Sequence, residues 1–406
     1  MFSIISFIIN LFLIILRPVY SLRIGLIPYR SLGRISGNME YYLRNQKYVS
    51  DKKKGIDLLI AGCNPVNHQI LTMIERRTKL IQNDFIWELL KKIQDNILKQ
   101  HENSRKTLDR FSWIDFSHSG FLLEWEIWQT IGPQLNFTNE EIVDGKRILV
   151  DLGIPTNREY VCIHARDSDY TDSPDFIRDP QDYFSYNDFR DCDISSYMPA
   201  AEWLVEQGLY VVRVGHQAKE EFSNGDERII DYAYHARNKM QNPEFADVFL
   251  QSHCKFFVGC TAGIYYLSHI FDIPMVFVNM VPLAESGRSN HDLFILKKYW
   301  NNIENRYMTF HEMVLRGADW NRLWHDTQKA IADEGIEIIN NSSEEILELT
   351  KEMFLRLQGV WVDEAIHQEF QNRFRNVFPQ NHPMRYFPGY IGSEFLLQNE
   401  DMLIVN

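Results

Sequence analysis

Short runs of consecutive apolar residues alternate along the chain with longer stretches in which apolar residues recur every three or four positions. A run of the first kind is typical of a buried strand, and a stretch of the second kind is typical of a helix with one apolar face. Strands are expected at 22–27, 56–61, 160–163, 209–214, 255–258 and 275–279. Helices are expected at 39–44, 67–77, 86–100, 122–131, 140–152, 195–207, 244–254 and 264–271. Repeated strand–helix units of this kind predict an α/β protein built on parallel sheets.

The expected units fall into two groups, each of ordinary domain size. The helix at 140–152 ends at Gly153, and a proline follows closely, which is a typical stop signal. We therefore expect one Rossmann-like domain at 21–153 and a second at 154–330. Prolines and glycines accumulate near the end of the chain. The segment 331–406 is accordingly expected to be a helical extension with a loosely ordered tail.

The start of the chain differs from the rest, because 1–16 are nearly all apolar. This stretch is short for a membrane span, which needs about 20 apolar residues. Four arginines follow it: Arg17, Arg23, Arg30 and Arg34. The pattern predicts an apolar helix within 1–20 that lies in the cytoplasmic leaflet and holds a cytoplasmic protein at the inner face of the membrane. A true N-terminal span and a buried helix packed on the first domain are the alternatives.

Composition narrows the class of protein. With 45% hydrophobic and 24% charged residues, the chain has an ordinary globular composition. Its formal net charge of -13 argues against a nucleic-acid partner, which would require a basic face, but leaves room for a local basic pocket. The five cysteines form no Cys-x-x-Cys pair, and the histidines show no His-Glu-x-x-His spacing. We therefore expect core thiols in a reducing compartment and no metal site.

The first group of candidate functional residues follows the strand expected at 160–163. His164, Arg166, Asp167 and Asp169 crowd the end of this apolar run. Open α/β sheets bind their ligands at the carboxyl ends of strands. An arginine fork can hold two phosphate oxygens, while a histidine or a carboxylate can take up a proton. A solvated polar turn after the strand fits the same pattern.

The second group follows the strand expected at 255–258, where a glycine turn leads into the next expected helix. A helix N-terminus presents backbone N–H groups that suit a diphosphate. Thr261 could cap this helix and also bond a phosphate oxygen. The candidate diphosphate ligands are Gly259, Thr261, Ala262 and Gly263. A plain glycine turn with a threonine cap is the alternative.

Further polar residues of the second domain join these candidates. Arg190 ends a long polar connection, and such connections are often functional. Arg213 lies inside an expected strand, so it must reach a pocket or form a buried ion pair, and the pattern favours neither. Gly215 follows that strand, and Glu285 and Ser286 lie in a polar loop after a later one.

Four segments of the second domain resemble a family of bacterial glycosyltransferases from surface-polysaccharide gene clusters. They are His164–Tyr170, Phe189–Ile194, Tyr210–Gly215 and Phe257–Gly263. The resemblance implies a GT-B-like fold, in which two Rossmann-like domains face a cleft. It implies a nucleotide-diphosphate sugar as donor, a glycan or lipid-linked glycan as acceptor, and no other cofactor. His164-x-Arg166 also resembles the His-x-Arg motif of fucosyltransferases, which implies that Arg166 holds the diphosphate of a GDP-sugar.

The first domain departs from a recognisable pattern. Its glycine loop, Gly33-Arg-Ile-Ser-Gly37, is not the dinucleotide fingerprint, so no nicotinamide cofactor is inferred. Asn38 and Glu40 are the acceptor-side candidates, with Glu40 as a candidate base. A base from the other domain, Asp167 or Asp169, could serve instead.

Two other interpretations compete with this one. Asp167-Ser-Asp169 and Asp191-Cys-Asp193 match the Asp-x-Asp motif that holds a divalent metal in single-domain GT-A enzymes. The repeated strand–helix units on both sides of Gly153 argue against that fold. The other competitor is a non-catalytic sugar-nucleotide-binding component of a membrane polysaccharide assembly complex.

Overall fold

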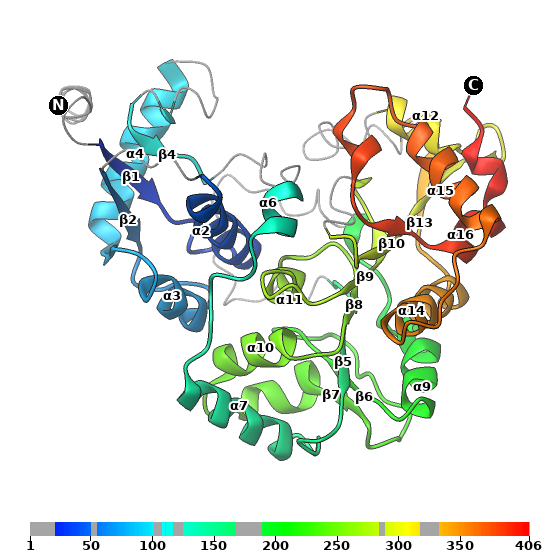
Figure 1. The fold of residues 1–406 in the computed structure, drawn as a ribbon, viewed down its shortest axis with the longest axis horizontal. Helices are drawn as coiled ribbons and strands as arrows, with labels where there is room; N and C mark the ends of the chain where they lie inside the picture. Colours follow the sequence, from blue (N-terminus) through cyan, green and yellow to red (C-terminus); the bar gives the residue numbers. More distant parts are fainter. Residues whose placement is uncertain are drawn as a thin grey trace. The chain divides into compact units, whose positions relative to one another are not determined.

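The computed structural model describes residues 21–49, 55–100, 108–109, 111–116, 125–167, 189–283, 289–316 and 333–405 (Figure 1). The chain divides into two compact units, Met1–Thr138 and Asn139–Asn406. They are called unit 1 and unit 2 below.

Unit 1 is built on a four-stranded parallel sheet in the order β3-β2-β1-β4. Its strands are β1 (Ser21–Leu26), β2 (Gly55–Ala61), β3 (Leu80–Gln82) and β4 (Trp113–Ile114). Its helices are η1 (Arg34–Asn38), α2 (Met39–Tyr48), α3 (His68–Glu75), α4 (Asp84–Gln100) and α6 (Trp125–Thr130). Asn67 caps α3 by accepting a hydrogen bond from the Ile70 N–H at 2.9 Å, as its residue type favours.

Unit 2 is built on a seven-stranded parallel sheet in the order β14-β10-β9-β8-β5-β6-β7. Its strands are β5 (Tyr160–His164), β6 (Tyr210–Arg213), β7 (Ile229–Asp231), β8 (Phe257–Gly259), β9 (Met275–Met280), β10 (Leu293–Leu296) and β14 (Tyr390–Ile391). From β5 the chain builds outward through β6 and β7, then returns to the other side of β5 to begin β8. The direction of winding therefore reverses between β5 and β8.

Helices cover both faces of this sheet (Figure 1). α9 (Met198–Glu206) and α14 (Ser343–Leu357) pack together on one face, and α14 also contacts β9 and β10. On the other face, α10 (Pro243–Ser252) packs against both α7 (Asn139–Asp151) and α11 (Tyr266–His269). β5, β8 and β9 consequently lie in the middle of the core, which explains their continuous apolar runs.

A small antiparallel sheet and a helical region complete unit 2. The sheet consists of β11 (Lys298–Asn301), β12 (Arg306–Tyr307) and β13 (Ile336–Ile339). The remaining helices are α12 (Phe310–Leu315), α15 (Ala365–Asn376) and α16 (Ser393–Gln398). α14 begins with a capping box between Ser342 and Glu345.

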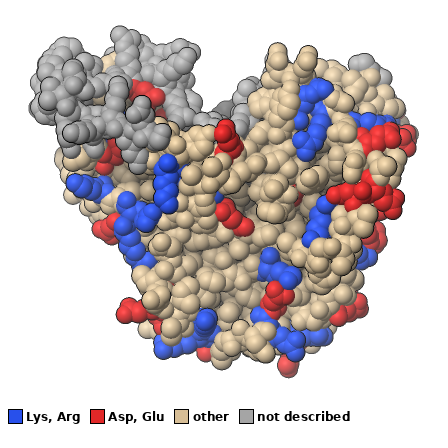
Figure 2. Space-filling model, viewed as in Figure 1, with Lys and Arg blue, Asp and Glu red and all other residues tan. Residues whose placement is uncertain are grey.

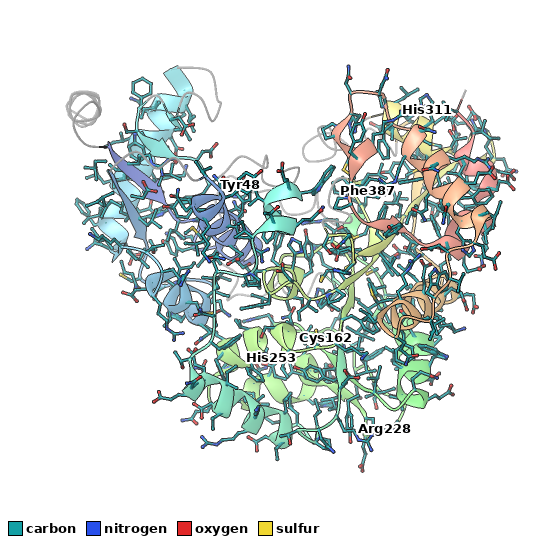
Figure 3. All side chains as sticks on the ribbon, in the orientation of Figure 1. Tyr48, Cys162, Arg228, His253, His311 and Phe387 are labelled. Carbon is teal, nitrogen blue, oxygen red and sulfur yellow. The ribbon has the colours of Figure 1, made fainter. Side chains whose placement is uncertain are left out.

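The predicted α/β class with parallel sheets is confirmed in both units, but the structure differs from the prediction at one domain boundary and in the tail. The division falls after Thr138 rather than at Gly153, because α7 packs on α10 of unit 2. The tail is not loosely ordered. β14 pairs in parallel with β10 at the sheet edge, and Phe387 beside it is fully buried (Figure 3). Scattered aromatic residues supply a core there despite the prolines.

The apolar helix expected within 1–20 lies outside the described residues. In the part of the chain that the structure describes, no helix is both long enough and apolar enough to cross a membrane.

Candidate functional site

The two groups of predicted site residues meet where the winding of the unit 2 sheet reverses. His164 ends β5 and pairs with Gly259, which ends β8. The approach is close, because a Cβ added to Gly259 would lie 2.9 Å from the His164 carbonyl oxygen and 2.5 Å from the Phe257 ring. Just beyond, the Arg166 N–H donates to the Cys260 Sγ at 3.1 Å. Such a reversal is where open α/β sheets bind ligands, so we call it the switch-point site.

Arg166 is held in place at this site by an ion pair. Its Nη1 donates to the Asp191 carboxylate, and both side chains are mostly buried. A guanidinium carries five N–H donors in a rigid fork, so a carboxylate that fixes one edge also fixes the direction of the fork.

Lys297 is the site residue that the sequence prediction missed. It follows β10, is only 2% exposed, and donates from Nζ to the carbonyl oxygens of Phe189 at 2.7 Å and Asp191 at 2.8 Å. It thereby anchors the segment that carries Arg190 and Asp191. A sequence signal for Lys297 was present. The residue directly follows the apolar run Leu293–Leu296, just as polar residues follow the apolar run before His164.

Three cations, Arg166, Arg190 and Lys297, lie near one another at the site. Burial lowers the pKa of Lys297, and the neighbouring charges of Arg166 and Arg190 act in the same direction. A hydrogen bond from the Cys192 thiol lowers the pKa of Cys260 to about 7, and the Arg166 N–H and nearby cations contribute. Cations that depress the pKa of neighbours in this way also favour an anionic ligand.

His164 is a neutral imidazole with a defined tautomer. Its Nδ1 lies 2.9 Å from the Val214 carbonyl oxygen, which can only accept, so Nδ1 carries the hydrogen and Nε2 carries the lone pair. Burial lowers its pKa to about 4. His164 can therefore accept a hydrogen bond at neutral pH, but it is a weak base.

The shifted pKa of His164 predicts a loss of stability in mild acid. Between the ordinary value of 6.5 and about 4, the unfolded chain binds the proton that the folded chain excludes. Stability should therefore fall as pH drops through this window, by up to about 3 kcal/mol. The variant His164→Gln should lack this part of the acid sensitivity, which urea unfolding at pH 7 and pH 4.5 would measure. An equal acid loss in both proteins would contradict the assignment.

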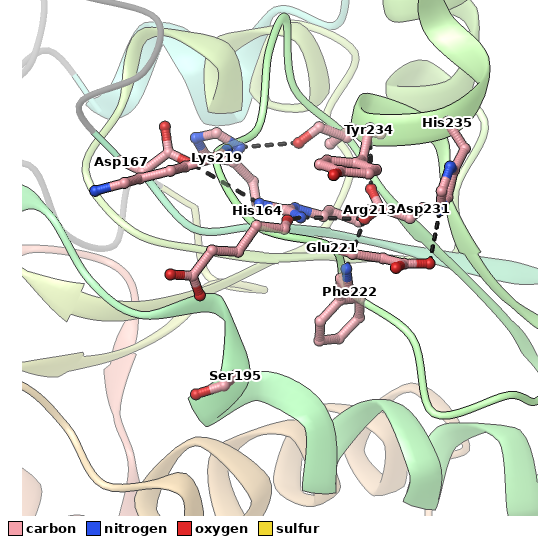
Figure 4. A network of polar contacts seen from close by, with 12 residues as sticks. His164, Asp167, Ser195, Arg213, Lys219, Glu221, Phe222, Asp231, Tyr234 and His235 are labelled. Carbon is pink, nitrogen blue, oxygen red and sulfur yellow. Dashed lines mark hydrogen bonds and ion pairs between the residues drawn. The ribbon is translucent and has the colours of Figure 1, made fainter.

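Asp167 contacts residues of β6 and of the loop that follows it (Figure 4). Its Oδ2 accepts from the Lys219 N–H at 3.3 Å and lies 3.8 Å from the Arg213 Nη2. Arg213 itself forms a buried ion pair with Asp231 at 3.1 Å and also donates to the Glu220 carbonyl oxygen. Of the two possibilities left open by the sequence, the structure shows a buried ion pair for Arg213, with Asp167 close by.

Gly215 supplies space beside these residues. A Cβ at this position would lie 3.3 Å from the Ala233 Cβ and 3.7 Å from the His164 Nδ1. The small residue thus permits the close passage of the chain behind His164.

The glycine turn after β8 differs from its prediction. Thr261 does not cap the next helix, because its buried hydroxyl donates to the Met280 Sδ at 3.4 Å and accepts from the Val281 N–H at 3.3 Å. The expected helix at 264–271 is only a 3-10 turn, Gly263–Tyr265, followed by the short α11, and its N-cap is Ala262. So short a helix has a small dipole, so this turn offers less to an anion than the sequence predicted.

The acceptor-side prediction for unit 1 was wrong in its chemistry. Glu40 is 0% exposed and accepts from the Arg44 Nε at 2.8 Å and from the backbone N–H groups of Gln134 at 2.7 Å and Leu135 at 3.1 Å. Asn38 is also buried, and its amide donates to the Phe116 carbonyl oxygen. Both side chains are buried and bonded within unit 1, which is not the exposed position expected of an acceptor-side residue.

Other predicted residues fall elsewhere. Asp169, Glu285 and Ser286 lie outside the described residues. The two aspartates of the second Asp-x-Asp motif have different partners. Asp191 pairs with Arg166, whereas Asp193 caps the 3-10 turn that precedes α9. The two carboxylates of this motif therefore do not converge as metal ligands would.

No family model matches this sequence, and no curated protein matches it. Among solved structures, the chain is similar to the ADP-heptose lipopolysaccharide heptosyltransferase II of E. coli, at 12% identity and a TM-score of 0.44, over 83% of this chain and 99% of that one. It is similar to a family 9 glycosyltransferase from Veillonella parvula DSM 2008, at 9% identity and a TM-score of 0.42, over 82% and 97% of the two chains. It is also similar to the dodecameric iron-containing heptosyltransferase TibC in complex with ADP-D-β-D-heptose, at 12% and 0.40, over 83% and 76%. Similarity at this level does not show which reaction the chain performs, so the function must be argued from its own residues.

Proposed function

We propose that the chain is a GT-B glycosyltransferase of surface polysaccharide biosynthesis. It would transfer a sugar from a nucleotide-diphosphate sugar, bound at the switch-point site, to a glycan or lipid-linked glycan. The observation that carries the proposal is the placement of Arg166, which an Asp191 ion pair fixes at the winding reversal beside the buried Lys297. The apolar segment 1–20 would keep the enzyme at the inner face of the membrane, where lipid-linked acceptors lie.

The proposed chemistry divides the work among residues of the site. Arg166, backed by the charges of Lys297 and Arg190, stabilises the diphosphate as it leaves, so the reaction is proposed to need no metal. Asp167 accepts the proton of the acceptor hydroxyl, and the neutral His164 orients that hydroxyl through Nε2. Asp167 is proposed as the base because it is the carboxylate that follows β5 and is held at the site by the Lys219 N–H.

The donor class can be tested by thermal unfolding of the full chain with a panel of nucleotide diphosphates and sugar nucleotides. A ligand at about 100 times its Kd should add roughly 2.7 kcal/mol to the free energy of unfolding. We expect one nucleotide class to raise the Tm equally with a divalent ion and with a chelator. Absence of any shift across the panel would remove the sugar-nucleotide proposal.

The competing function is a binding protein that holds a sugar nucleotide without turnover, and Asp167→Asn separates the two. The substitution preserves shape while it removes the proposed base. For an enzyme, release of the nucleoside diphosphate in the presence of a lipid-linked acceptor fraction should fall by about 10²–10⁴-fold. Donor affinity should change little, as isothermal titration would show. An unchanged rate would remove the role of Asp167, and donor binding without release by the unaltered protein would favour the binding function.

A further inference from the structure

Two cysteines of unit 2 that are distant in the sequence lie on either side of the Arg166 backbone. Cys260 directly follows β8, and its Sγ accepts a hydrogen bond from the Arg166 N–H at 3.1 Å. Cys192 follows Asp191, and its N–H donates to the Arg166 carbonyl oxygen at 3.0 Å. Both cysteines are free thiols, and the two thiols form a hydrogen bond with each other. We call them the switch-point thiols.

A second pair of cysteines in the same unit provides a comparison. Cys162 lies in β5 (Figure 3), and its side chain interacts with that of Cys254, which follows α10. The Cys162 Sγ donates to the Leu250 carbonyl oxygen at 3.4 Å, and the Cys254 Sγ donates to the Gln251 carbonyl oxygen at 3.4 Å. A carbonyl oxygen can only accept, so both of these thiols keep their protons. We call them the core pair.

The switch-point thiols have the opposite surroundings. Cys260 accepts a backbone N–H, which favours a negatively charged sulfur atom. The hydrogen bond from Cys192, the Arg166 N–H and the charge of Lys297 lower the pKa of Cys260 to about 7. The hydrogen bond to Cys260 and burial raise the pKa of Cys192, which therefore keeps its proton. A thiolate beside a thiol is the arrangement that redox-active cysteines require.

The charge that stabilises the thiolate originates within the site. Basic and acidic side chains are interspersed on the visible face of unit 2, so the surface there does not supply it (Figure 2). Lys297, in contrast, is only 2% exposed, and its ammonium is fixed by hydrogen bonds to two backbone carbonyl oxygens. Solvent screens a buried cation of this kind much less than an exposed one.

Burial restricts which reagents reach the switch-point thiols. Cys260 is fully buried, and Cys192 is 9% exposed. Such a position excludes a bulky oxidant such as glutathione disulfide, whereas hydrogen peroxide is close to water in size. The exposed Cys63 of unit 1 lacks this protection. A small peroxide is therefore the oxidant that suits the pair.

We propose that Cys192 and Cys260 are a peroxide-sensitive pair that forms a reversible disulfide and thereby displaces Arg166. In the disulfide, the Cys260 sulfur no longer carries the charge that holds the Arg166 N–H. The new bond also pulls on the segment that carries Asp191, the partner of the Arg166 guanidinium. A transient disulfide of this kind is compatible with a reducing compartment. Its consequence, weaker nucleotide binding in the oxidised protein, rests on the proposed function.

The reaction balances with hydrogen peroxide as the oxidant. The Cys260 thiolate attacks one peroxide oxygen, so an S–O bond forms, the O–O bond breaks, and the released hydroxide takes up a proton to become water. The Cys192 sulfur then attacks the sulfenic acid, so the S–S bond forms, the S–O bond breaks, and the hydroxide leaves as water with the Cys192 proton. Two electrons pass from the two thiols to one peroxide, and two water molecules result. A dithiol such as dithiothreitol returns the pair to the thiol form.

Peptide mass spectrometry of the full chain tests the proposal. The protein is treated with hydrogen peroxide in a Cys63→Ser background, which removes the exposed thiol, and is then unfolded, alkylated and digested. We expect a cross-linked pair of peptides that contain Cys192 and Cys260, and this pair should disappear on reduction with dithiothreitol. The thiols of the core pair should remain open to alkylation. In hydrogen exchange, the Arg166 amide should exchange about 10-fold faster after oxidation, as expected for the loss of one hydrogen bond.

Two single substitutions are the matched controls. Cys260→Ser keeps an oxygen that can accept from the Arg166 N–H, but it cannot form the disulfide. Peroxide should therefore leave the exchange rate of the Arg166 amide unchanged in this variant. Cys254→Ala removes one thiol of the core pair, and it should leave the cross-link between Cys192 and Cys260 intact.

Several results would overturn the proposal. Peroxide could leave both switch-point thiols unmodified, could convert one of them to a sulfinic acid without a cross-link, or could cross-link the core pair to the same extent, which would indicate unspecific damage. An unchanged exchange rate at Arg166 after complete cross-linking would contradict the displacement. Because no measurement involves a nucleotide, failure here leaves the glycosyltransferase proposal standing, and failure of that proposal does not affect the outcome here.

Discussion

Glu40→Ala should destabilise unit 1 by about 3–5 kcal/mol, because it leaves the Arg44 guanidinium buried without its counter-charge. Both side chains are 0% exposed, and the Glu40 carboxylate accepts three hydrogen bonds that alanine cannot replace. Hydrogen exchange of unit 1 peptides, followed by mass spectrometry, would measure the loss separately from unit 2.

A matched control exists in the same unit. Lys91 and Asp95 form an ion pair with the same four-residue spacing, but they are 39% and 41% exposed. Asp95→Ala should cost no more than about 0.5 kcal/mol. Replacing Glu40 and Arg44 together by leucine and methionine should recover only part of the lost stability, because the buried charge is removed but the N–H groups of Gln134 and Leu135 still lack an acceptor. Similar small losses in Glu40→Ala and Asp95→Ala would show that the buried pair is not a structural anchor.

Arg166→Ala should weaken binding of a nucleotide diphosphate by about 10- to 100-fold, the range expected for a charge-assisted hydrogen bond. Arg166→Lys should recover only part of the affinity, since an ammonium keeps the charge but lacks the planar fork. Isothermal titration with the nucleotide that raises the Tm most would measure both.

Arg228→Ala is the control for this series. Arg228 is also an arginine of unit 2 in an ion pair, here with Asp226, and it lies at the opposite side of the strands from the switch-point site (Figure 3). Its substitution should leave nucleotide affinity unchanged. Equal affinity of Arg166→Ala and the unaltered protein would remove Arg166 from the donor site, whatever the enzyme transfers.

Local sequence patterns predicted the sheet but only part of the site. The apolar runs before His164 and Gly259 were sufficient to place both groups on strands, and parallel pairing then brought them together. The role of Glu40 could not be predicted, because the backbone groups it binds are 94 and 95 residues away in the sequence. The Arg166–Asp191 pair was likewise hidden, since each residue alone is consistent with a solvated turn.

Short or interrupted elements also escaped prediction. β7 and β14 contain too few residues to show a periodicity, and their apolar positions are buried only through contacts with distant strands. For Thr261, a local pattern predicted a role that the structure does not show. Its residue type suits a helix cap, but its hydroxyl forms hydrogen bonds with Met280 and Val281 at the end of β9.

The parallel pairing of β14 with β10 has a consequence for synthesis of the chain. A ribosome completes β5 to β10 long before it reaches Tyr390, so the growing sheet carries an open edge while helices α14 and α15 are still being made. An unpaired edge is a template for another extended chain. Release of unit 2 from the ribosome before β14 docks would therefore favour aggregation, and C-terminal truncations before Tyr390 should accumulate as inclusion bodies rather than as shortened soluble protein.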